Sequence, residues 1–345
     1  MNEMPKAPGA SQDRRALLDL IAGKWLSQAV STCAELGIAD ILKDGPRSAD
    51  EIATIAGASP GAMFRLLRAL ASVGLLSSED RRFELTASGN YLRSDVPGSL
   101  RGWARFVGHP MTWRPWGELA HSVRTGTPAF EHVFGVPIFD YLARDPDAAA
   151  ILNDAMTSVS TADATAVVQA YDFSPVHTLV DVGGGHGLML ATVLKAHPHM
   201  RGVLFELPHA IEGASVLLER EGVAPRCELV SGDFFRSVPE GGDAYLLKLV
   251  LHDWDDERAL QILRNCQSVM RPNGTLLLVD FVLRAGDERD FGKFADLEML
   301  VLNSGGRERT ELEFRDLLRK AGFRVTQIVP TVTPKSVIEA VRSLG

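Results

Sequence analysis

The chain has 345 residues, of which 46% are hydrophobic and 23% are charged, so it is long enough for two domains with a large core. Its formal net charge of −8 argues against a general nucleic-acid binder, because phosphate binding needs a basic surface. The three cysteines, Cys33, Cys227 and Cys266, show no metal-ligand spacing, which favours a reduced, intracellular protein.

The amino-terminal stretch MNEMPKAPGASQDRR contains no apolar segment of signal-peptide length and is typical of a frayed tail. The longest apolar runs, such as GTLLLV, are too short to cross a bilayer. The sequence therefore predicts a cytoplasmic protein that does not enter a membrane.

From residue 13 to about residue 171, apolar residues recur at helical spacing. Within this part, Ser48 and Glu51 form a capping box that begins a short helix. AMFRLLRALASVG then predicts a second amphipathic helix, and LLSSEDRRFELT predicts a hairpin. This order of helix, turn, helix and β-wing is similar to a winged helix.

A winged helix allows two interpretations. It could bind DNA through Arg65 and Arg68, or it could be a structural or dimerisation element. Residues 1–100 contain 11 lysines and arginines against 12 acidic residues, so this part is not basic. The charge balance favours the structural interpretation and no nucleic-acid partner.

The second half has a different pattern. Short β-like runs (HTLVDVG, RGVLFEL, RCELVSG, DAYLLKLVL, GTLLLVDFVL and FRVTQIV) alternate with helical stretches. Such alternation predicts an α/β fold with a mainly parallel, doubly wound sheet. We expect an amino-terminal domain at 1–110, a helical linker at 111–170 and a sheet domain at 171–345.

The stretch LVDVGGGHG places Asp181 and then Gly183, Gly185 and Gly187 between a strand and a helix. Glycines there allow a tight turn and a close approach to a ligand, and Glu206 at the end of the next strand can accept from ribose hydroxyls. The spacing does not match the pyrophosphate fingerprint, and Asp181 would repel a pyrophosphate. The pattern favours a nucleoside cofactor with a positively charged group over a turn without a ligand.

A third strand is followed by Gly232, Asp233 and Phe234, again at the edge where ligands bind in such sheets. The carboxylate can accept from the exocyclic amine of an adenine while the ring packs against the base. The alternative, a polar turn followed by core phenylalanines, is the simpler one for this stretch taken alone. The register with the two other strand ends favours adenine binding.

The stretch KLVLHDWDD ends a fourth strand in His252, with three carboxylates close behind. A metal site would need several converging ligands. Asp253 or Asp255 is instead well placed to cap the following helix, so we expect no metal. Although a lone histidine is more often structural, this one lies beside three strand ends that are predicted to bind the cofactor, which favours a general base.

The stretch RGWARFVGHPMTWRPWGELAHSV is rich in aromatic residues. Trp103 and Phe106 are candidates to stack on a planar acceptor in a pocket between the two domains. For Trp113 and Trp116 a core or dimer contact is the favoured interpretation.

Six motifs in combination resemble the S-adenosylmethionine-dependent O-methyltransferases of plant phenolics and bacterial aromatic natural products. They are LVDVGGGHG, FELPHAI, GDFF, KLVLHDWDDERALQILRNC, LLLVDFVL and GGRERTELEF, and the match runs over nearly the whole chain. The resemblance implies a Rossmann-like class I methyltransferase domain with an amino-terminal, mainly helical winged-helix domain that forms a homodimer. It also implies S-adenosyl-L-methionine as cofactor, S-adenosyl-L-homocysteine as its product, and a small aromatic hydroxylated acceptor of phenolic or polyketide type.

The resemblance also implies roles for single residues. Gly183, Gly185, Glu206, Asp233, Phe234 and Lys248 would lie around the cofactor, and the sequence pattern adds Asp181 and Gly232 to this set. His252 matches the general base, with Glu308 and Asp280 as its acidic neighbours. Asp280 is Glu in plant members, so we expect Glu308 to be the main partner. Met299 and Asn303 match positions that line the acceptor pocket, and we add Trp103, Phe106 and Asp253 as further candidate acceptor contacts.

Two alternatives stay open. Relatives that keep the cofactor can drift to hydroxylation or to methylation of nitrogen or carbon. A protein of another class would be a transcription regulator that uses the winged helix, with the sheet domain as its sensor. The sequence does not predict which acceptor or which hydroxyl is methylated.

Overall fold

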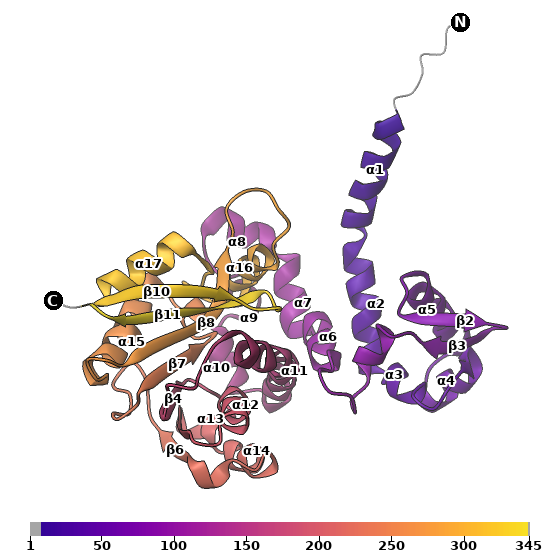
Figure 1. Cartoon of the computed structure of the whole chain (residues 1–345). Coiled ribbons are helices and arrows are strands. Elements are labelled where there is room, and N and C mark those ends of the chain that lie inside the picture. The colour runs from indigo at the N-terminus through magenta and orange to yellow at the C-terminus, as the bar shows by residue number, and fades with distance from the viewer. Residues whose placement is uncertain (1–7, 344–345) are drawn as a thin grey trace, which may run out of the picture. The chain divides into compact units, whose positions relative to one another are not determined.

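The computed structural model describes residues 8–343 and divides into two compact units (Figure 1). The first unit extends to Trp113 and includes Asp147–Ser158. The second consists of Arg114–Pro146 and the chain from Val159 onward.

The first unit is mainly helical and contains one small sheet. Its elements are α1 (Pro8–Ile21), α2 (Gly23–Glu35), α3 (Ile38–Ile41), β1 (Arg47–Ser48), α4 (Ala49–Ala56), α5 (Pro60–Ser72), β2 (Leu76–Glu79), β3 (Arg82–Leu85), the 3-10 turn η1 (Gly89–Leu92) and α6 (Arg101–Gly108). The strands pair in the antiparallel order β1-β3-β2.

The predicted helix starts and hairpin are present in this unit. Ser48 and Glu51 form the expected capping box of α4, with both reciprocal hydrogen bonds. The β2–β3 hairpin turns at Asp80 and Arg81, which both have positive φ, as a tight two-residue hairpin turn requires. Buried side chains from α4, α5 and β3 form a core of their own, including Ile52, Leu67 and Phe83.

The second unit is built on a mixed sheet. Its strands are β4 (Thr178–Val182), β5 (Arg201–Glu206), β6 (Cys227–Ser231), β7 (Ala244–Lys248), β8 (Thr275–Leu283), β9 (Arg309–Thr310), β10 (Phe323–Pro330) and β11 (Lys335–Arg342). Their order is β10-β11-β8-β7-β4-β5-β6, and β9 pairs with β8. The pairs among β4 to β8 are parallel, while β11 pairs antiparallel with both β8 and β10.

The remaining helices and 3-10 turns, which belong mostly to the second unit, have the following bounds. They are α7 (Pro110–Gly117), α8 (Leu119–Thr125), α9 (Ala129–Phe134), α10 (Ile138–Leu142), α11 (Pro146–Ala170), α12 (Leu188–Ala196), α13 (Pro208–Ile211), α14 (Ala214–Arg220), η2 (Ala224–Arg226), η3 (Leu251–Asp253), α15 (Asp256–Val269), α16 (Phe291–Leu302) and α17 (Glu311–Lys320).

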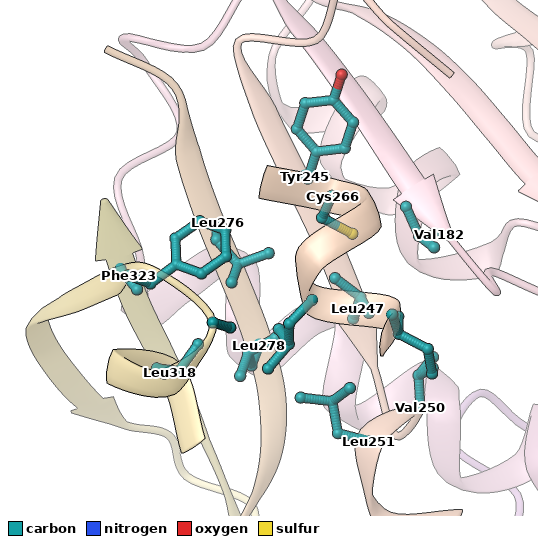
Figure 2. Close-up of a cluster of buried hydrophobic side chains, with 14 of the residues drawn as sticks. Val182, Tyr245, Leu247, Val250, Leu251, Cys266, Leu276, Leu278, Leu318 and Phe323 are labelled. Atoms are coloured by element: carbon teal, nitrogen blue, oxygen red, sulfur yellow. The ribbon is translucent and has the colours of Figure 1, made fainter. Parts of the chain in front are cut away.

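Helices cover both faces of the sheet, as in a doubly wound fold (Figure 1). On one face α15 and α17 bury apolar side chains against β7 and β8. Cys266 and Leu318 come together there with the strand residues Leu247 and Leu278 (Figure 2). On the other face, α12, α14 and the end of α11 form a second core with the strands.

The predicted alternation of strands and helices is confirmed, and the structure adds two strands to this sheet that the sequence pattern did not single out. The short strand β9 pairs with β8. The strand β11 places KSVIEAVR between β8 and β10 and is paired by hydrogen bonds on both sides. No described helix is both long and apolar enough to span a membrane.

Candidate active site

Four parallel strands deliver the candidate residues to one edge of the sheet. Asp181 is the second-to-last residue of β4, Glu206 is the last residue of β5, Gly232 follows β6, and Lys248 is the last residue of β7. Because the carboxyl ends of parallel strands meet at one edge, the predicted convergence follows from the topology.

The glycine loop (residues 183–187) turns sharply between β4 and α12. Gly183, Gly185 and Gly187 have φ of +71°, +57° and +82°, a region that favours glycine. The Gly185 amide donates to Glu206 Oε2 at 3.0 Å, which ties the loop to the end of β5. The three glycines that the sequence places after β4 are therefore the residues whose backbone has positive φ in the loop.

The loop also lies close to residues of the two other strand ends. A Cβ added at Gly183 would lie 3.0 Å from Val250 Cγ2 and 3.4 Å from the ring of Phe234. Residues that follow β4, β6 and β7 are thus in contact range of one another. A side chain at position 183 would therefore crowd Val250 and Phe234.

Asp181 lies beneath the loop and is completely buried. Within residues 8–343, neither of its carboxylate oxygens has a hydrogen-bond partner. Burial raises the pKa of Asp181 to about 7, although the nearby Lys248 acts in the opposite direction. A buried carboxyl group left without a partner suits a ligand that carries positive charge or hydrogen-bond donors, so the residues fit a sulfonium cofactor.

The stretch after β6 forms a polar turn beside aromatic rings. Asp233 Oδ1 accepts from the Phe235 amide at 2.9 Å, and its other oxygen lies 3.7 Å from Arg236 Nε. The ring of Phe234 meets that of Phe235 edge to face at a centroid distance of 4.9 Å. The arrangement contains both features predicted for an adenine site, an acceptor and an adjacent apolar ring.

Lys248 points toward α11. Its Nζ donates to Ser160 Oγ at 3.0 Å and lies 3.8 Å from Asp163 Oδ2, and burial lowers its pKa. Asp163 also pairs with Lys335 at 3.1 Å. The prediction that Lys248 lies near the cofactor stays a prediction, since its described partners belong to the protein.

His252 lies in a strained turn, which we call the base turn (residues 249–256). After β7, Leu249 has φ of +52°, an unusual conformation for a bulky residue that costs about 1–3 kcal/mol. The turn η3 then carries His252, and Asp255 caps α15 by accepting from the Arg258 amide at 2.9 Å. Of the two predicted caps, Asp255 is therefore the one that the structure has.

The His252 ring is held by a buried carboxylate. Its Nδ1 lies 2.8 Å from Oε1 of Glu308, whose side chain is fully buried. Although burial by itself lowers the pKa of His252, the carboxylates of Asp253, Glu308 and Asp280 outweigh it and raise this pKa to about 9. An imidazole that donates from Nδ1 to Glu308 keeps its Nε2 lone pair available as a base.

Asp280 is the second acidic neighbour of His252. It is 1% exposed, neither oxygen has a hydrogen-bond partner among the described residues, and burial raises its pKa to about 7. One ligand atom each from His252, Asp280 and Glu308 lie within 4.8 Å of one another. These atoms could also hold a metal ion, so the expected absence of a metal stays a prediction.

Three predicted acceptor residues lie near His252. Asn303 Nδ2 donates to Asp253 Oδ1 at 2.8 Å and lies 3.5 Å from Met299 Sδ. Asp253 Oδ1 lies 3.7 Å from His252 Nε2, on the side of the ring that faces away from Glu308. Asp253, Met299 and Asn303 thus form one cluster with His252.

The predicted aromatic residues belong to different places. Trp103 and Phe106 lie on α6 in the first unit, with ring centroids 5.5 Å apart, and their contact with an acceptor stays a prediction. In the second unit, the Trp116 indole donates to Glu298 of α16. Burial raises the pKa of Glu298 to about 7. This contact agrees with the structural interpretation of Trp116.

Sequence analysis missed several polar residues near the site. Asp163, Glu298 and Lys335 are named in no motif, and their partners are distant in the chain. Arg309 is fully buried and contacts the base turn. The only available signal for Arg309 was its place in the stretch GGRERT, which was used for Glu308 alone.

Comparisons with known proteins agree with this architecture. The family description O-methyltransferase domain matches residues 116–324, which include all the strand ends described above. The description O-methyltransferase dimerisation domain matches residues 18–95. That stretch contains the capping box and the hairpin, so the second match favours dimerisation over DNA binding.

Similar proteins align over nearly the full chain. A phenazine O-methyltransferase of Lysobacter antibioticus is 43% identical, covering 94% of this chain and 95% of that protein. An 8-amino-8-demethylriboflavin N,N-dimethyltransferase of Streptomyces davaonensis is 37% identical, covering 90% of each. The crystal structure of an O-methyltransferase from neocarzinostatin biosynthesis contains S-adenosyl-L-homocysteine and 1,4-dihydroxy-2-naphthoic acid. It is 35% identical, with a TM-score of 0.76 over 92% of this chain and 96% of that one. With the glycine loop, the buried carboxylates and the strand order all consistent with these matches, the chain belongs to the S-adenosylmethionine-dependent O-methyltransferase family.

Proposed function

We propose that the protein methylates a hydroxyl group of a small aromatic natural product of phenolic or polyketide type, with His252 as the general base. The observation that carries this proposal is the 2.8 Å contact between His252 Nδ1 and the buried Glu308, in a turn whose Val250 approaches Gly183 of the glycine loop. The related structure that contains a dihydroxynaphthoic acid supports an aromatic acceptor.

The cofactor would be held by the residues at the strand ends. We assign the ribose hydroxyls to Glu206, the adenine to Asp233 and Phe234, and the positively charged part to Asp181. Gly183, Gly185 and Gly232 leave room for close approach, and Lys248 lies at the end of the adjacent strand. When bound, S-adenosyl-L-methionine supplies an electrophilic methyl group on a positively charged sulfur.

The residues around His252 then have to orient the acceptor and take its proton. A free phenol has a pKa of about 10 and a free imidazole a pKa of about 6.5, so unassisted proton transfer is uphill. The carboxylates near His252 raise its pKa to about 9 and remove most of this difference. General-base help of this kind contributes roughly 10²- to 10⁴-fold.

The acceptor would lie on the Nε2 side of His252, against Asp253, Met299 and Asn303. Asn303 holds the Asp253 carboxylate by a 2.8 Å hydrogen bond, so that group is oriented before the acceptor arrives. The contact of Trp103 and Phe106 with the acceptor stays a prediction. Holding two reactants in line can contribute up to about 7–11 kcal/mol in the best cases.

The test is mass spectrometry of a panel of catechols, flavonoids and polyketide aromatics incubated with the protein and S-adenosyl-L-methionine. We expect a product heavier by one methyl group. His252→Ala should abolish that product while calorimetry shows unchanged cofactor binding. His199→Ala is the matched control, because His199 lies at the opposite edge of the sheet, where its ring contacts the Val176 carbonyl. Equal loss of activity and cofactor binding in His252→Ala would refute the base assignment.

The same products separate the alternatives. An aminated aromatic in the panel tests methylation of nitrogen, which the similarity to a riboflavin-analogue N,N-dimethyltransferase makes the second candidate. A product heavier by one oxygen atom would indicate hydroxylation. Addition of a chelator should leave the rate unchanged. A chelator-sensitive rate would show that a metal takes part, with His252, Asp280 and Glu308 as its candidate ligands.

We also propose that the protein is a homodimer through its first unit. Apolar side chains of α1 and α2 are exposed in the single chain, including Leu20 at 78%, Ile21 at 65% and Trp25 at 70%. Such a contiguous apolar surface is typical of an interface. Light scattering should give twice the mass of the chain, and Trp25→Glu should reduce it, whereas a monomeric wild-type protein would contradict this.

A further inference from the structure

The base turn is held by a second stretch of chain, the GGRERT segment (residues 305–310). The Arg307 amide donates to the His252 carbonyl at 2.8 Å. A Cβ added at Gly306 would lie 2.9 Å from the same carbonyl oxygen, so the two segments are in close contact. They are far apart in the sequence and meet at the base.

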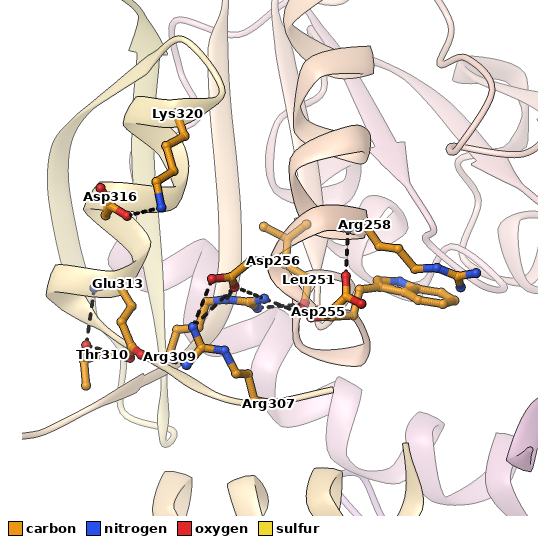
Figure 3. Close-up of polar contacts among 11 residues, drawn as sticks. Leu251, Asp255, Asp256, Arg258, Arg307, Arg309, Thr310, Glu313, Asp316 and Lys320 are labelled. Carbon is orange, nitrogen blue, oxygen red and sulfur yellow. Dashed lines mark hydrogen bonds and ion pairs between the residues drawn. The ribbon is translucent and has the colours of Figure 1, made fainter. Parts of the chain in front are cut away.

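Arg309 is the residue of this segment that makes the most contacts with the base turn. Its Nη1 donates to the Leu251 carbonyl at 2.8 Å and its Nη2 to the Trp254 carbonyl at 2.9 Å. Its Nε and Nη2 both reach Asp256 Oδ1, at 3.1 and 2.9 Å (Figure 3). The carbonyls on either side of His252 are thus fixed by one guanidinium group.

Three observations make this contact unusual. The Arg309 side chain is only 1% exposed, so the guanidinium has left water entirely. The turn that it holds contains Leu249 at φ +52°, a strained conformation that persists only where surrounding contacts enforce it. Arg309 is the first residue of β9 and directly follows Glu308, so two consecutive residues supply the group that holds the turn and the group that holds the ring.

We propose that Arg309 is a positioning residue, which fixes the direction of the His252 ring by holding the turn that carries it. This inference rests on the proposed role of His252 as general base. In this proposal Arg309 contacts neither reactant. It affects the rate because it sets the distance between His252 Nδ1 and Glu308 Oε1. Only a planar group with several donors can span two carbonyls and a carboxylate at once.

The test is Arg309→Lys, which keeps the positive charge but cannot make the same set of hydrogen bonds. Misplacement of a catalytic group by about 1 Å can cost on the order of 100-fold, so we expect kcat to fall about 10- to 100-fold. The KM values for S-adenosyl-L-methionine and for the acceptor should change less than about threefold, because the glycine loop is untouched.

A second readout follows the ring itself. NMR titration of the His252 Cε1 proton, assigned by its absence in His252→Ala, measures the pKa of this residue without turnover. The groups that face the ring are Glu308, Asp253 and Asp280, and Arg309→Lys leaves all three carboxylates in the chain. If the ring loses its fixed contact with Glu308, its pKa should fall by about one unit or more toward the ordinary value of about 6.5.

Arg226→Lys is the matched control. Arg226 also spans backbone carbonyls, those of Leu194 and Met200 at 2.8 and 2.9 Å, but at the opposite edge of the sheet. A purely structural arginine should lower the melting temperature without changing kcat or the His252 titration. We expect that behaviour for Arg226→Lys and not for Arg309→Lys.

The outcomes separate the inference from the proposed function. If Arg309→Lys keeps the wild-type kcat and His252 titration, the inference is wrong while the base assignment stands. If His252→Ala keeps activity, the base assignment is wrong, and the titration alone still tests the hold of Arg309 on the ring. If Arg309→Lys does not fold, Asp256→Asn removes the half-exposed partner of Arg309 and should lower kcat several-fold in the same direction. An unchanged kcat in that variant would then overturn the inference.

Discussion

The glycine loop and the base turn follow two neighbouring strands, β4 and β7, but they are held in different ways. The loop takes its shape mainly from its own glycines, at φ of +71°, +57° and +82°. The base turn takes its shape from distant residues, since Glu308, Arg309 and Asn303 all contact it from more than forty residues along the chain.

This difference has a chemical reason. A nucleoside is recognised largely by backbone shape and by one or two carboxylates, which a short motif can supply. A general base needs a set direction, a raised pKa and exclusion of water, and these require groups converging from several segments. The glycine loop is therefore shaped mainly by its own residues, whereas the base turn is held by residues from distant segments of the chain.

The largest expected effect on kcat is that of Glu308→Gln, which changes a distant partner of the base turn. An amide in place of the carboxylate removes the charge that orients His252 and raises its pKa, so kcat should fall roughly 10²- to 10⁴-fold. Cofactor binding by calorimetry should stay within about twofold. If Asp280→Asn has the larger effect on kcat, the assignment of the main partner has to be exchanged.

The pH dependence of kcat/KM is the next largest effect. The pKa of His252 is raised to about 9, so below that pH the ring is mostly protonated and cannot accept a proton. We expect kcat/KM to rise about tenfold per pH unit from pH 7 and to level off near pH 9. In Glu308→Gln the rise should occur at lower pH. A profile that is flat from pH 6 to 9 in the wild type would contradict the raised pKa.

Gly183→Ala tests the glycine loop. Alanine is strained by about 1–2 kcal/mol at φ +71°, and its Cβ would lie 3.0 Å from Val250 Cγ2. We expect the dissociation constant for S-adenosyl-L-homocysteine to rise about tenfold, while kcat at saturating cofactor stays within a few-fold. Gly241→Ala is the control, since Gly241 has φ +94° and open space around it. A loss in kcat alone would show that the glycine loop and the base turn do not act independently.

The smallest expected effect is that of Asp255→Ala. Asp255 caps α15 through the Arg258 amide at 2.9 Å, and loss of such a cap costs about 1 kcal/mol of unfolding free energy. Thermal unfolding should show a modest loss of stability, and kcat should change less than about threefold because Arg309 still holds the turn. A drop in kcat as large as that of Arg309→Lys would mean that the cap, and not Arg309, positions His252.

The sequence correctly predicted the place of the glycine loop and of the strands around it. The alternation of apolar runs identified β4, β5 and β7, and the glycine spacing placed the loop directly after β4. The capping box at Ser48 and the helix cap near His252 were also readable, because such signals involve residues only a few positions apart.

The residues that hold the base turn were predicted less completely. His252 was recognised from its place after a strand, but Glu308 became a candidate only through the resemblance to a known family. Arg309 was not recognised at all, and neither was the ion pair between Lys335 and Asp163, which are 172 residues apart. No periodicity or local spacing connects groups at such separations.

For this protein, the sequence by itself determined the fold class, the winged-helix pattern, the glycine loop and the place of His252 after β7. These features depend on backbone preferences and on side chains within a few residues of one another. Only the tertiary structure decided which carboxylate contacts the His252 ring, that Asp255 and not Asp253 caps α15, and that a buried arginine holds the base turn. Those choices depend on which distant segments pack together, because burial and convergence, and not residue type, set the pKa and direction of a catalytic group.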